Sequence, residues 1–343
     1  MWRPMLIRWW LAQRPSVMVR PTTTRTVPGR VLVVPDEDFT VVADDGYPLH
    51  GSIWHGAGDG PVVVIHAATA VRAHYYARFA AWLSGRGCTV LTFDYRGIGQ
   101  SRHGPLRGLQ AGWTHWGALD AGAVQAYARS RWPDRPLMAV GHSIGGFALG
   151  LAPASVHLTR IVTVGAQFAY WRDYAPGQRL PMYLKWHLIM PLLTRIFGYF
   201  PGARLGWLED VPRGVALDWA GMGPRFETSV TSHLTPSDLA VRHGATDARL
   251  LAIGLTDDPF GTEAATARLL GYYTKADRTH LRIAPGDLGS PEIGHFAFFH
   301  TRFERTLWPL VAAWLLEGQL PETAPGRIVA MSSAGQASGA THP

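Results

Sequence analysis

The sequence predicts an α/β protein whose central sheet is mostly parallel, with helices on both faces. Short runs rich in Val, Ile and Leu, such as "PVVVIHA" and "CTVLTF", are typical of strands that are buried on both sides. Segments with helical spacing of their apolar residues follow several of these runs and end at Gly or Pro. Strands that alternate with helices in this way form a doubly wound sheet.

The elements follow one another regularly along most of the chain. "FTVVA" and "LHGSIW" flank the turn-like "DDGYP", which predicts an antiparallel hairpin at the start of the sheet. Further strands are expected at 61–67, 88–97, 137–141, 159–166, 248–258 and 279–285. Helices are expected at 75–87, 116–133, 262–273 and 302–318. The second of these helices is ended by a proline, which cannot continue the hydrogen-bonding pattern.

The alternation stops between residues 166 and 247. This stretch is rich in Trp, Tyr, Leu, Pro and Gly and contains "LPMYLKWHLIMPLLTRIFGYFPG". An insertion of this size after the sixth strand is most simply a helical lid over the carboxyl ends of the strands, where such sheets bind ligands. The core would then occupy residues 37–165 and 248–318. An N-terminal arm (1–36) would precede it, and the small, polar residues of the tail (319–343) predict disorder.

The composition argues against several classes of function. The net charge of +7 is spread along the chain without a dense basic run, so we expect no nucleic-acid partner. The single cysteine, Cys88, cannot form an internal disulfide and fits a reducing, cytoplasmic location. The sequence has no zinc-type His/Glu spacing and no Gly-Lys-Ser/Thr phosphate loop, so we expect no metal and no organic cofactor.

Two segments leave weak contact with a membrane surface open as an alternative. The first 20 residues contain apolar residues (Met5, Leu6, Trp9 and Trp10) interspersed with Arg3, Arg8 and Arg14. This pattern is compatible with a basic amphipathic helix, although a loose arm or an early-called start codon is favoured. The apolar segment of the expected lid is interrupted by Lys185 and Arg195, and no uncharged apolar stretch reaches the length of about 18 residues that a spanning helix needs. Packing against the core and a pocket is the favoured interpretation of the lid, and docking on a membrane surface is the alternative.

The stretch "AVGHSIGGFALG" places one serine between two glycines. Ser143 stands between an apolar run expected as a strand and one expected as a helix. Gly141 and Gly145, two residues to either side, leave room for the sharp, strained turn that exposes a nucleophilic hydroxyl above a sheet. Because the chain contains 38 glycines, the simpler alternative is a glycine-loosened corner that formed by chance.

A serine nucleophile needs a base, and the base needs an acid to orient it. The chain offers both after Ser143, in the order serine, acid, histidine, at the expected ends of strands. His295 lies in "EIGHFAFF", where Gly294 leaves room for the ring to turn. "GLTDDPFG" offers two acids, of which Asp258 is favoured because it begins a turn directly at the strand end. Asp257 remains the alternative and is expected to cap the loop.

Backbone N–H groups must also stabilise the charge that develops on a substrate oxygen. The first is expected at Ile144, at the start of the helix after the serine. The second is expected at Ala68, in the loop "AATAV" after the third strand, where small alanines permit close approach. His66 and His142 each adjoin one of these strands, but both precede the acid, so we expect structural or pocket-lining roles for them.

With the serine turn, the stretch "FDYRGIGQS" makes the sequence resemble a known group. The chain resembles lidded α/β-hydrolases of the serine aminopeptidase and monoglyceride-lipase-like group over roughly residues 39–317, most of all a bacterial branch with a "TDDP" loop and a "GHFxFF" loop. The resemblance implies the α/β-hydrolase fold and the roles of nucleophile, acid and base for Ser143, Asp258 and His295. It also implies that the aspartate and arginine of "DYRG" hold loops together. "HAAT" stands where the group commonly has His-Gly.

These observations predict a serine hydrolase that acts through an acyl-enzyme on a small-molecule acyl substrate. The lid segment offers more apolar surface than one packed helix face needs: Tyr183, Trp186, Ile189, Met190, Leu193, Ile196 and Phe197. We therefore expect part of it to line an acyl pocket and favour a carboxylester hydrolase that prefers short-to-medium apolar acyl groups. The alternatives are a serine aminopeptidase or amidase, an acyltransferase, and a non-catalytic binding protein that keeps the fold.

Overall fold

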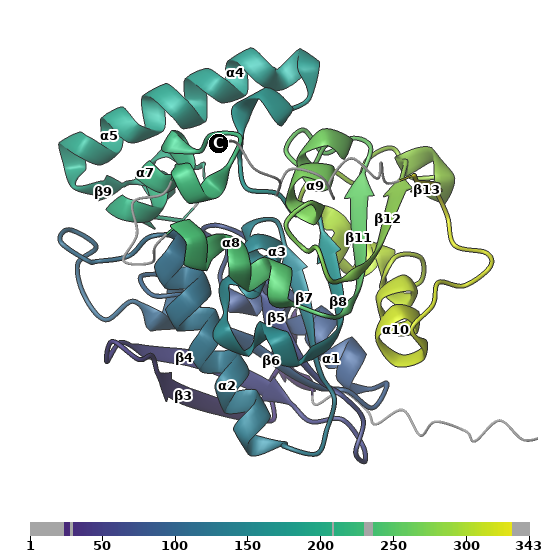
Figure 1. The fold of residues 1–343 in the computed structure, drawn as a ribbon. Helices are drawn as coiled ribbons and strands as arrows, with labels where there is room; N and C mark the ends of the chain where they lie inside the picture. The colour runs from purple at the N-terminus through teal and green to yellow at the C-terminus, as the bar shows by residue number, and fades with distance from the viewer. Residues whose placement is uncertain (1–23, 28–29, 208, 230–235, 331–343) are drawn as a thin grey trace, which may run out of the picture.

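A computed structural model of the chain describes residues 24–27, 30–207, 209–229 and 236–330 (Figure 1). Within these residues nine strands form one sheet in the order β13-β12-β11-β8-β7-β5-β6-β4-β3, and β1–β2 and β9–β10 form two separate hairpins. The strands are β1 (Thr24–Val27), β2 (Arg30–Val33), β3 (Glu37–Val42), β4 (Pro48–Trp54), β5 (Val62–His66), β6 (Thr89–Phe93), β7 (Leu137–His142), β8 (Leu158–Val164), β9 (Tyr199–Phe200), β10 (Val211–Pro212), β11 (Arg249–Leu255), β12 (Asp277–Ile283) and β13 (Arg327–Val329). Most of the expected N-terminal arm, with its amphipathic alternative, lies outside the described residues.

The centre of the sheet is parallel, which confirms the predicted fold class. The strands β6, β5, β7, β8, β11 and β12 run in one direction, and antiparallel partners flank them: β4 and β3 on one side, β13 on the other. Every residue of β5, β6 and β7 is buried, because helices cover both faces of these strands. Their sequences are therefore continuous apolar runs rather than alternating ones.

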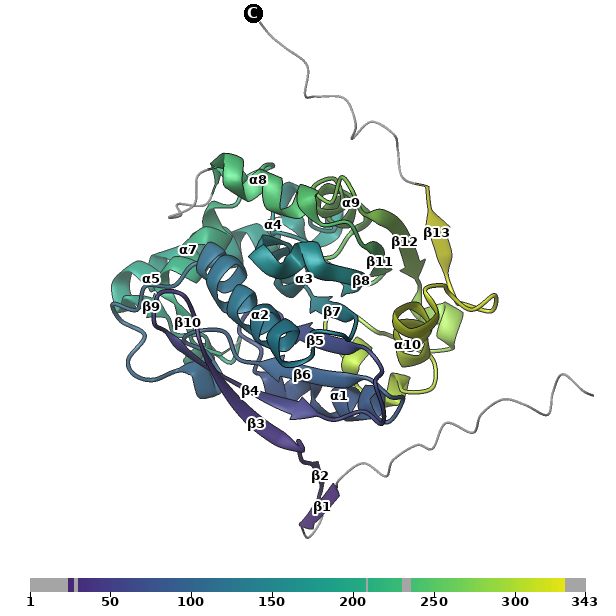
Figure 2. The same cartoon turned by 60° about the horizontal axis from the view of Figure 1, so that its bottom comes forward.

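The helices pack on both sides of the sheet. α1 and α10 lie against one face, and α2 and α3 lie against the other (Figure 2). The helices are α1 (Ala77–Ser84), α2 (Gly122–Arg131), α3 (Ile144–Ala148), α4 (Arg179–Tyr183), α5 (Met190–Phe197), α6 (Gly202–Leu205), α7 (Arg213–Gly221), α8 (Pro236–Ala245), α9 (Glu263–Leu270) and α10 (Trp308–Glu317). The last helix was expected from residue 302 but begins at Trp308, because Pro309 lacks an N–H and fits only the first turn of a helix.

The end of the described chain differs from the sequence-based expectation. Disorder is predicted over residues 319–343, yet Arg327–Val329 form β13, antiparallel to β12, with Ile328 opposite Leu281. The polar composition of the tail conceals this strand, because its backbone groups pair with the open edge of the sheet without needing apolar side chains. Residues 331–343 lie outside the described part of the chain.

Between β8 and β11 the chain leaves the sheet. The insertion, residues 166–247, contains α4 to α8 and the β9–β10 hairpin, and it lies across the end of the molecule toward which β7 and β11 point (Figure 1). α4, the π-helical turn Leu184–Ile189 and α5 follow one another without a break and form its longest helix. In the part of the chain that the structure describes, no helix is long and apolar enough to cross a membrane.

Candidate active site

Ser143 stands on a strained turn between β7 and α3. Its φ of 54° and ψ of −122° lie in a region that residues with a side chain rarely adopt. Two backbone hydrogen bonds hold this conformation: the Ser143 N–H donates to the Val164 carbonyl at 2.9 Å, and the Gly146 N–H donates to the Ser143 carbonyl at 3.0 Å. The turn is therefore fixed from β8 on one side and from α3 on the other.

The two glycines around Ser143 are required by crowding. A Cβ atom at Gly145 would collide with the backbone carbonyl of His66, and one at Gly141 would collide with the backbone of Gly146. The glycine pattern is thus explained by close backbone packing at this turn. The simpler alternative, a loose corner, does not account for these contacts.

His295 and Asp258 form a buried pair beside this turn. The ring Nδ1 of His295 lies 2.7 Å from Oδ2 of Asp258, and the Asp258 side chain is fully buried. Burial alone would raise the pKa of Asp258, but His295 and the N–H groups of Gly261 and Phe260 outweigh it and hold that pKa below its ordinary value. Because the carboxylate accepts, Nδ1 carries the proton, and Nε2 of the neutral ring has its lone pair free to accept a proton.

The neighbouring acid has a different place. Asp257 is exposed, and its Oδ2 accepts the N–H groups of Ile293 and Gly294 at 2.8 and 2.9 Å. It therefore caps the loop that carries His295 and does not contact the ring. Gly294 has a φ of 65°, which explains a glycine directly before the histidine.

Two further glycines close around the pair and were not singled out in the sequence. A Cβ atom at Gly165 would lie 2.7 Å from Oδ2 of Asp258 and 3.3 Å from Nδ1 of His295. One at Gly261 would lie 2.6 Å from the same Asp258 oxygen. Gly165 lies at the end of the predicted strand 159–166 and Gly261 lies three residues after the predicted strand 248–258, and this position at strand ends is the signal that could have identified them.

Ser143 and His295 both line a cavity of about 370 Å³ beneath the insertion. The other lining residues are mostly aromatic or apolar: Ala68, Thr69, Trp113, Ile144, Gln167, Ala169, Gln178, Pro181, Met182, Lys185, Trp186, Trp207, Trp219, Pro259, Phe260 and Phe296. A largely apolar cavity with a few convergent polar groups is typical of a small-molecule site. Of the seven insertion residues expected at the pocket, Trp186 lines it, whereas Ile189 and Ile196 are exposed on the outside of the helix.

The second expected oxyanion donor is already engaged. The Ala68 N–H donates to the Tyr76 hydroxyl at 3.0 Å, so the sequence-based prediction of a free donor at Ala68 departs from the structure. Tyr76 was not singled out, because nothing in the sequence shows that its hydroxyl reaches back eight residues. Ile144 begins α3 and lines the cavity as expected, and Thr69, next to Ala68, also lines it.

The Tyr76 hydroxyl continues into a buried chain of hydrogen bonds. It lies 2.8 Å from Nδ1 of His142, and Nε2 of His142 lies 2.8 Å from the backbone carbonyl of His295. Since a carbonyl only accepts, Nε2 of His142 carries the proton and Tyr76 donates to Nδ1. Burial lowers the pKa of His142 to about 3, so the ring stays neutral and serves as a structural link.

His66 is likewise a core residue. It is fully buried, its Nε2 lies 3.3 Å from Nε2 of Gln125, and it does not line the cavity. Burial lowers the pKa of His66 to about 3, which keeps this ring neutral as well.

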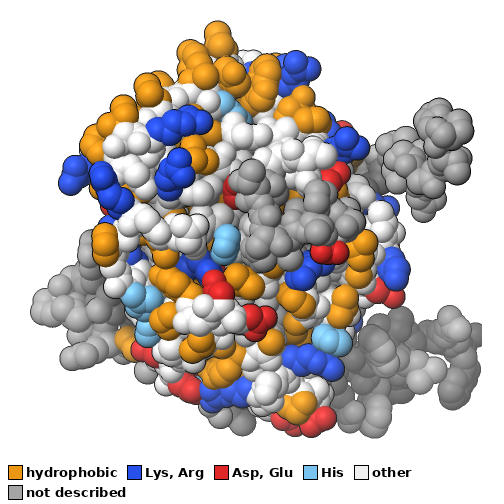
Figure 3. All heavy atoms as spheres, turned by 60° about the vertical axis from the view of Figure 1, so that its left-hand side comes forward, with side chains coloured by type: hydrophobic (Ala, Val, Ile, Leu, Met, Phe, Trp, Pro, Cys, Tyr) orange, Lys and Arg blue, Asp and Glu red, His pale blue; other side chains and the backbone are white. Residues whose placement is uncertain are grey.

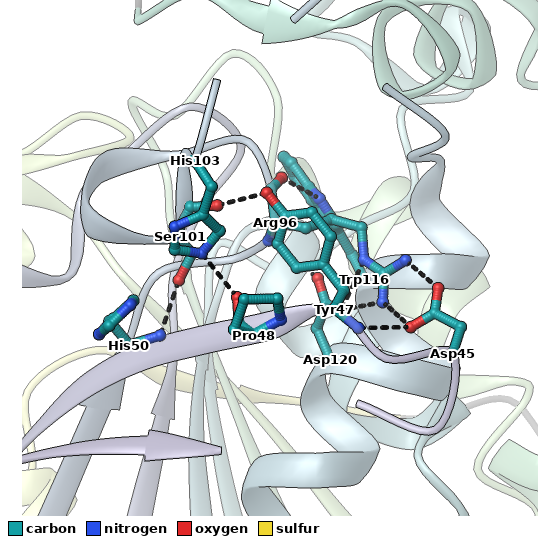
Figure 4. Close-up of polar contacts among 9 residues, drawn as sticks. All are labelled: Asp45, Tyr47, Pro48, His50, Arg96, Ser101, His103, Trp116 and Asp120. Atoms are coloured by element: carbon teal, nitrogen blue, oxygen red, sulfur yellow. Dashed lines mark hydrogen bonds and ion pairs between the residues drawn. The ribbon is translucent and has the colours of Figure 1, made fainter. Parts of the chain in front are cut away.

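The "DYRG" turn after β6 builds a separate polar cluster (Figure 4). Arg96 is almost fully buried and lies between Asp120, at 2.7 Å, and Asp45, with Tyr47 packed against its guanidinium. The Arg96 N–H also donates to Asp120 at 2.9 Å. Asp94 accepts the backbone N–H groups of Ala73 and Gln100 through its two carboxylate oxygens. These contacts join loops, as the resemblance implied, and none of these residues lines the cavity.

The sheet order and the helices on both of its faces are those of the α/β-hydrolase fold. Residues 58–207 match the model of the serine aminopeptidase family S33, so the chain is similar to that group over this part of its length. Comparison with curated protein sequences gives no significant match.

Solved structures share the fold at low sequence identity. A soluble variant of monoglyceride lipase from Saccharomyces cerevisiae, in complex with a substrate analogue, has a TM-score of 0.56 and 15% identity, over 85% of this chain and 97% of that one. The structure of DcsB in complex with its substrate analogue has a TM-score of 0.55 and 14% identity, over 82% of this chain and 98% of that one. The esterase domain from a Rhodothermus marinus protein has a TM-score of 0.51 and 15% identity, over 82% of this chain and 98% of that one.

Proposed function

We propose that the protein is a serine hydrolase that works through an acyl-enzyme and cleaves carboxylic esters with apolar acyl groups. The observation that carries the proposal is the buried Asp258–His295 pair, whose histidine lines the same largely aromatic cavity as Ser143. Pure binding of an apolar ligand would need neither the strained serine nor the buried acid behind the histidine.

In this mechanism the Ser143 oxygen attacks the ester carbonyl, and Nε2 of His295 takes its proton. Asp258 holds the ring in the required tautomer and stabilises the imidazolium that forms. The Ile144 N–H, at the start of α3, faces the developing oxyanion, and we assign the second donor to Thr69 in place of Ala68. His295 then protonates the leaving alcohol and activates the water that releases the acid.

The serine and the histidine are not yet engaged with each other. No hydrogen bond joins the Ser143 hydroxyl to the His295 ring among the described residues, although both groups line the cavity. Such bonds are often long in ligand-free enzymes and tighten when substrate binds.

The charges around the cavity favour an ester over a peptide with a free amino terminus. No Asp or Glu is among the described residues that line the cavity, and its wall carries a cation, Lys185. Five of the seven carboxylates of the insertion have partners outside the cavity lining or on the backbone: Asp173 with Arg268, Glu209 with Arg72, Asp210 with Arg102, Asp218 with the Trp113 N–H and Glu227 with Tyr272. The other two, Asp238 and Asp247, do not line the cavity. A substrate ammonium would therefore meet no anionic anchor, which disfavours the aminopeptidase alternative.

Labelling with a fluorophosphonate probe tests the nucleophile. Ser143→Ala should abolish labelling and lower turnover of 4-nitrophenyl esters by about a million-fold, whereas Ser130→Ala, exposed on α2 and outside the cavity lining, should change neither. Labelling that persists in the Ser143 variant would contradict the assignment.

A substrate series tests the acyl preference. For 4-nitrophenyl esters of two to twelve carbons, kcat/KM should rise several-fold per carbon until the cavity is full, because each buried methylene contributes about 0.8 kcal/mol. A flat profile with faster cleavage of aminoacyl anilides would favour the amidase alternative.

A further inference from the structure

The longest helix of the insertion carries a row of exposed aliphatic side chains. We call this row the aliphatic stripe: Leu180, Leu184, Leu188, Leu192 and Ile196. Each is between 43% and 66% exposed, and each lies four residues after the previous one. Figure 3 shows hydrophobic side chains gathered at the top of this face of the molecule.

The stripe is not needed to attach the helix to the core. The opposite side of the same helix already buries Met182, Trp186 and Met190, and the first two line the cavity. An ordinary surface helix presents polar residues opposite its buried face, so a second apolar face indicates contact with a partner.

The spacing keeps the stripe on one side of the helix. Residues four apart drift gradually around a regular α-helix. The π-helical turn Leu184–Ile189 holds more residues per turn and opposes this drift. The five side chains thus form a ridge along the helix rather than a spiral.

The charged side chains along the stretch of chain that carries the stripe are all positive, and the next acids, Glu209 and Asp210, pair with Arg72 and Arg102. Residues 174–208 contain Arg179, Lys185, Arg195 and Arg204 and no Asp or Glu. The Lys185 ammonium lies over the rings of Trp186 and Trp207, at 4.5 and 4.2 Å from their centroids, and has no carboxylate partner among the described residues. An aliphatic ridge with cations and no anions complements a partner that is both apolar and anionic.

Other occupants of the stripe fit less well. In a symmetric contact with a second copy, the same cations would face each other. The segment 1–23 of this chain carries four arginines and no acid, so its charge also has the wrong sign. The cores of protein interfaces are enriched in aromatic residues and Met, whereas every member of the stripe is Leu or Ile.

We infer that the aliphatic stripe docks the protein on an anionic lipid surface. The Leu and Ile side chains would enter the boundary between headgroups and acyl chains, and Arg179 and Arg195 of the same helix would lie at the level of the phosphates, whereas Lys185 belongs to the cavity wall. Because Met182 and Trp186 line the cavity from the other side of this helix, docking would bring the cavity close to the lipid. The inference does not depend on the proposed hydrolysis.

Sedimentation of the full-length protein with lipid vesicles tests the inference. We expect binding to phosphatidylcholine vesicles that contain phosphatidylglycerol, weaker binding to pure phosphatidylcholine, and a decrease with added salt. The double variant Leu188→Gln, Leu192→Gln should bind the anionic vesicles about tenfold more weakly or worse. Arg195→Gln should weaken binding to the anionic vesicles by about fivefold and leave pure phosphatidylcholine unaffected.

Val241→Gln is the matched control. Val241 is 66% exposed on α8, as exposed as any member of the stripe, and its replacement should leave vesicle binding unchanged. Thermal melting checks that all variants are folded, which keeps the vesicle assay valid even for a protein without esterase activity.

Three results would overturn the inference. The first is that the unchanged protein does not sediment with anionic vesicles. The second is vesicle binding that the double variant retains in full. The third is a dimer, seen by sedimentation velocity, that the double variant dissolves, because the stripe would then be a contact between copies.

Discussion

Two buried carboxylates in this molecule each face a basic side chain, and they have opposite pKa shifts. The Asp258 carboxyl meets His295, and hydrogen bonds and the ring hold its pKa below the ordinary value despite burial. The Asp120 carboxyl meets Arg96 at the same distance, 2.7 Å, yet burial raises its pKa to about 6. Arg96 is shared with Asp45, so it compensates the buried charge of Asp120 less completely.

The difference separates the pair that we propose as catalytic from a structural one. Arginine keeps its proton at every accessible pH, and both sides of Arg96 are occupied by carboxylates. Histidine can gain and lose a proton near neutral pH, and the His295 ring lines the cavity. Thus the buried ion pair with a titratable partner and access to a substrate is the one suited to catalysis.

Among the buried carboxylates, the largest effect is expected at Asp258. Asp258→Asn should lower kcat by about 10⁴-fold, because the amide no longer fixes the His295 tautomer or stabilises its charged form. Asp257→Asn is the matched control and should cost far less, since Asp257 caps the loop through backbone N–H groups. Steady-state kinetics on one ester compares the two variants. Equal losses would mean that both acids act only through the loop.

Substitutions in the polar cluster around Arg96 should lower stability rather than turnover. Arg96→Met leaves the Asp120 carboxylate buried without its cation and should lower the free energy of unfolding by about 3–5 kcal/mol. The kcat of the folded fraction should stay near that of the unchanged protein. Urea unfolding and active-site titration measure the two quantities. A large loss of kcat at unchanged stability would place Arg96 in the catalytic machinery.

A third buried carboxylate gives a pH-dependent effect. Burial raises the pKa of Asp218 from its ordinary value of 3.8, which we expect in the unfolded chain, to about 7 in the folded protein. The hydrogen bond that Asp218 accepts from the Trp113 N–H offsets this increase only in part. Below about pH 4 the Asp218 carboxyl is protonated in both states and stability is unaffected. Between about pH 4 and pH 7 the unfolded chain releases this proton while the folded protein keeps it, so stability falls across this range and levels off above pH 7.

Asp218→Asn removes this ionisation. The free energy of unfolding of the variant should equal that of the unchanged protein at pH 4 and exceed it by at most about 4 kcal/mol at pH 8, the equivalent of three pKa units. Thermal melting from pH 4 to pH 8 follows the gain, which must grow with pH. A gain that is constant with pH would mean that the carboxyl stays in one protonation state.

The smallest effect is expected at Tyr76. Tyr76→Phe leaves the Ala68 N–H and Nδ1 of His142 without their partner, which should cost about 1–3 kcal/mol of stability. Because this chain ends on the His295 carbonyl, kcat should also fall, by about tenfold or less. Tyr47→Phe is the matched control: the Tyr47 hydroxyl donates to the Ser101 carbonyl in the Arg96 cluster, so its removal should lower stability and leave kcat unchanged. Equal kcat values for the two variants would remove the positioning role of Tyr76.

Local patterns in the sequence were sufficient for most of the fold. Buried runs such as Val62–His66 predict parallel strands because burial on both faces permits no polar alternation. The turn around Ser143 could also be predicted from a local pattern, because Gly141 and Gly145 are required by backbone crowding within a few residues of the serine. β13 was missed because a three-residue edge strand is specified by backbone pairing rather than by its side chains.

The parts of the site that were missed depend on long-range contacts. Trp113, Trp219 and Phe260 line the cavity from elements that are distant in the sequence, and no local pattern predicts that these rings lie together. The Tyr76 hydroxyl takes the N–H expected for the oxyanion only because α1 and its preceding turn pack beside the Ala68 loop. Lys185 was noted as an interruption of an apolar segment, and its place in the cavity wall follows from the fold of the insertion.

The short strand β13 also bears on the solubility of the protein. Without it, β12 would present a row of unpaired N–H and C=O groups at the edge of a large sheet, a surface that recruits strands from other molecules. β13 covers part of that row, with His280 opposite Val329, and is itself too short to serve as a template. A chain shortened after Gly318 would keep the cavity and the His295 loop but expose this edge, so it should aggregate at concentrations at which the full chain stays in solution.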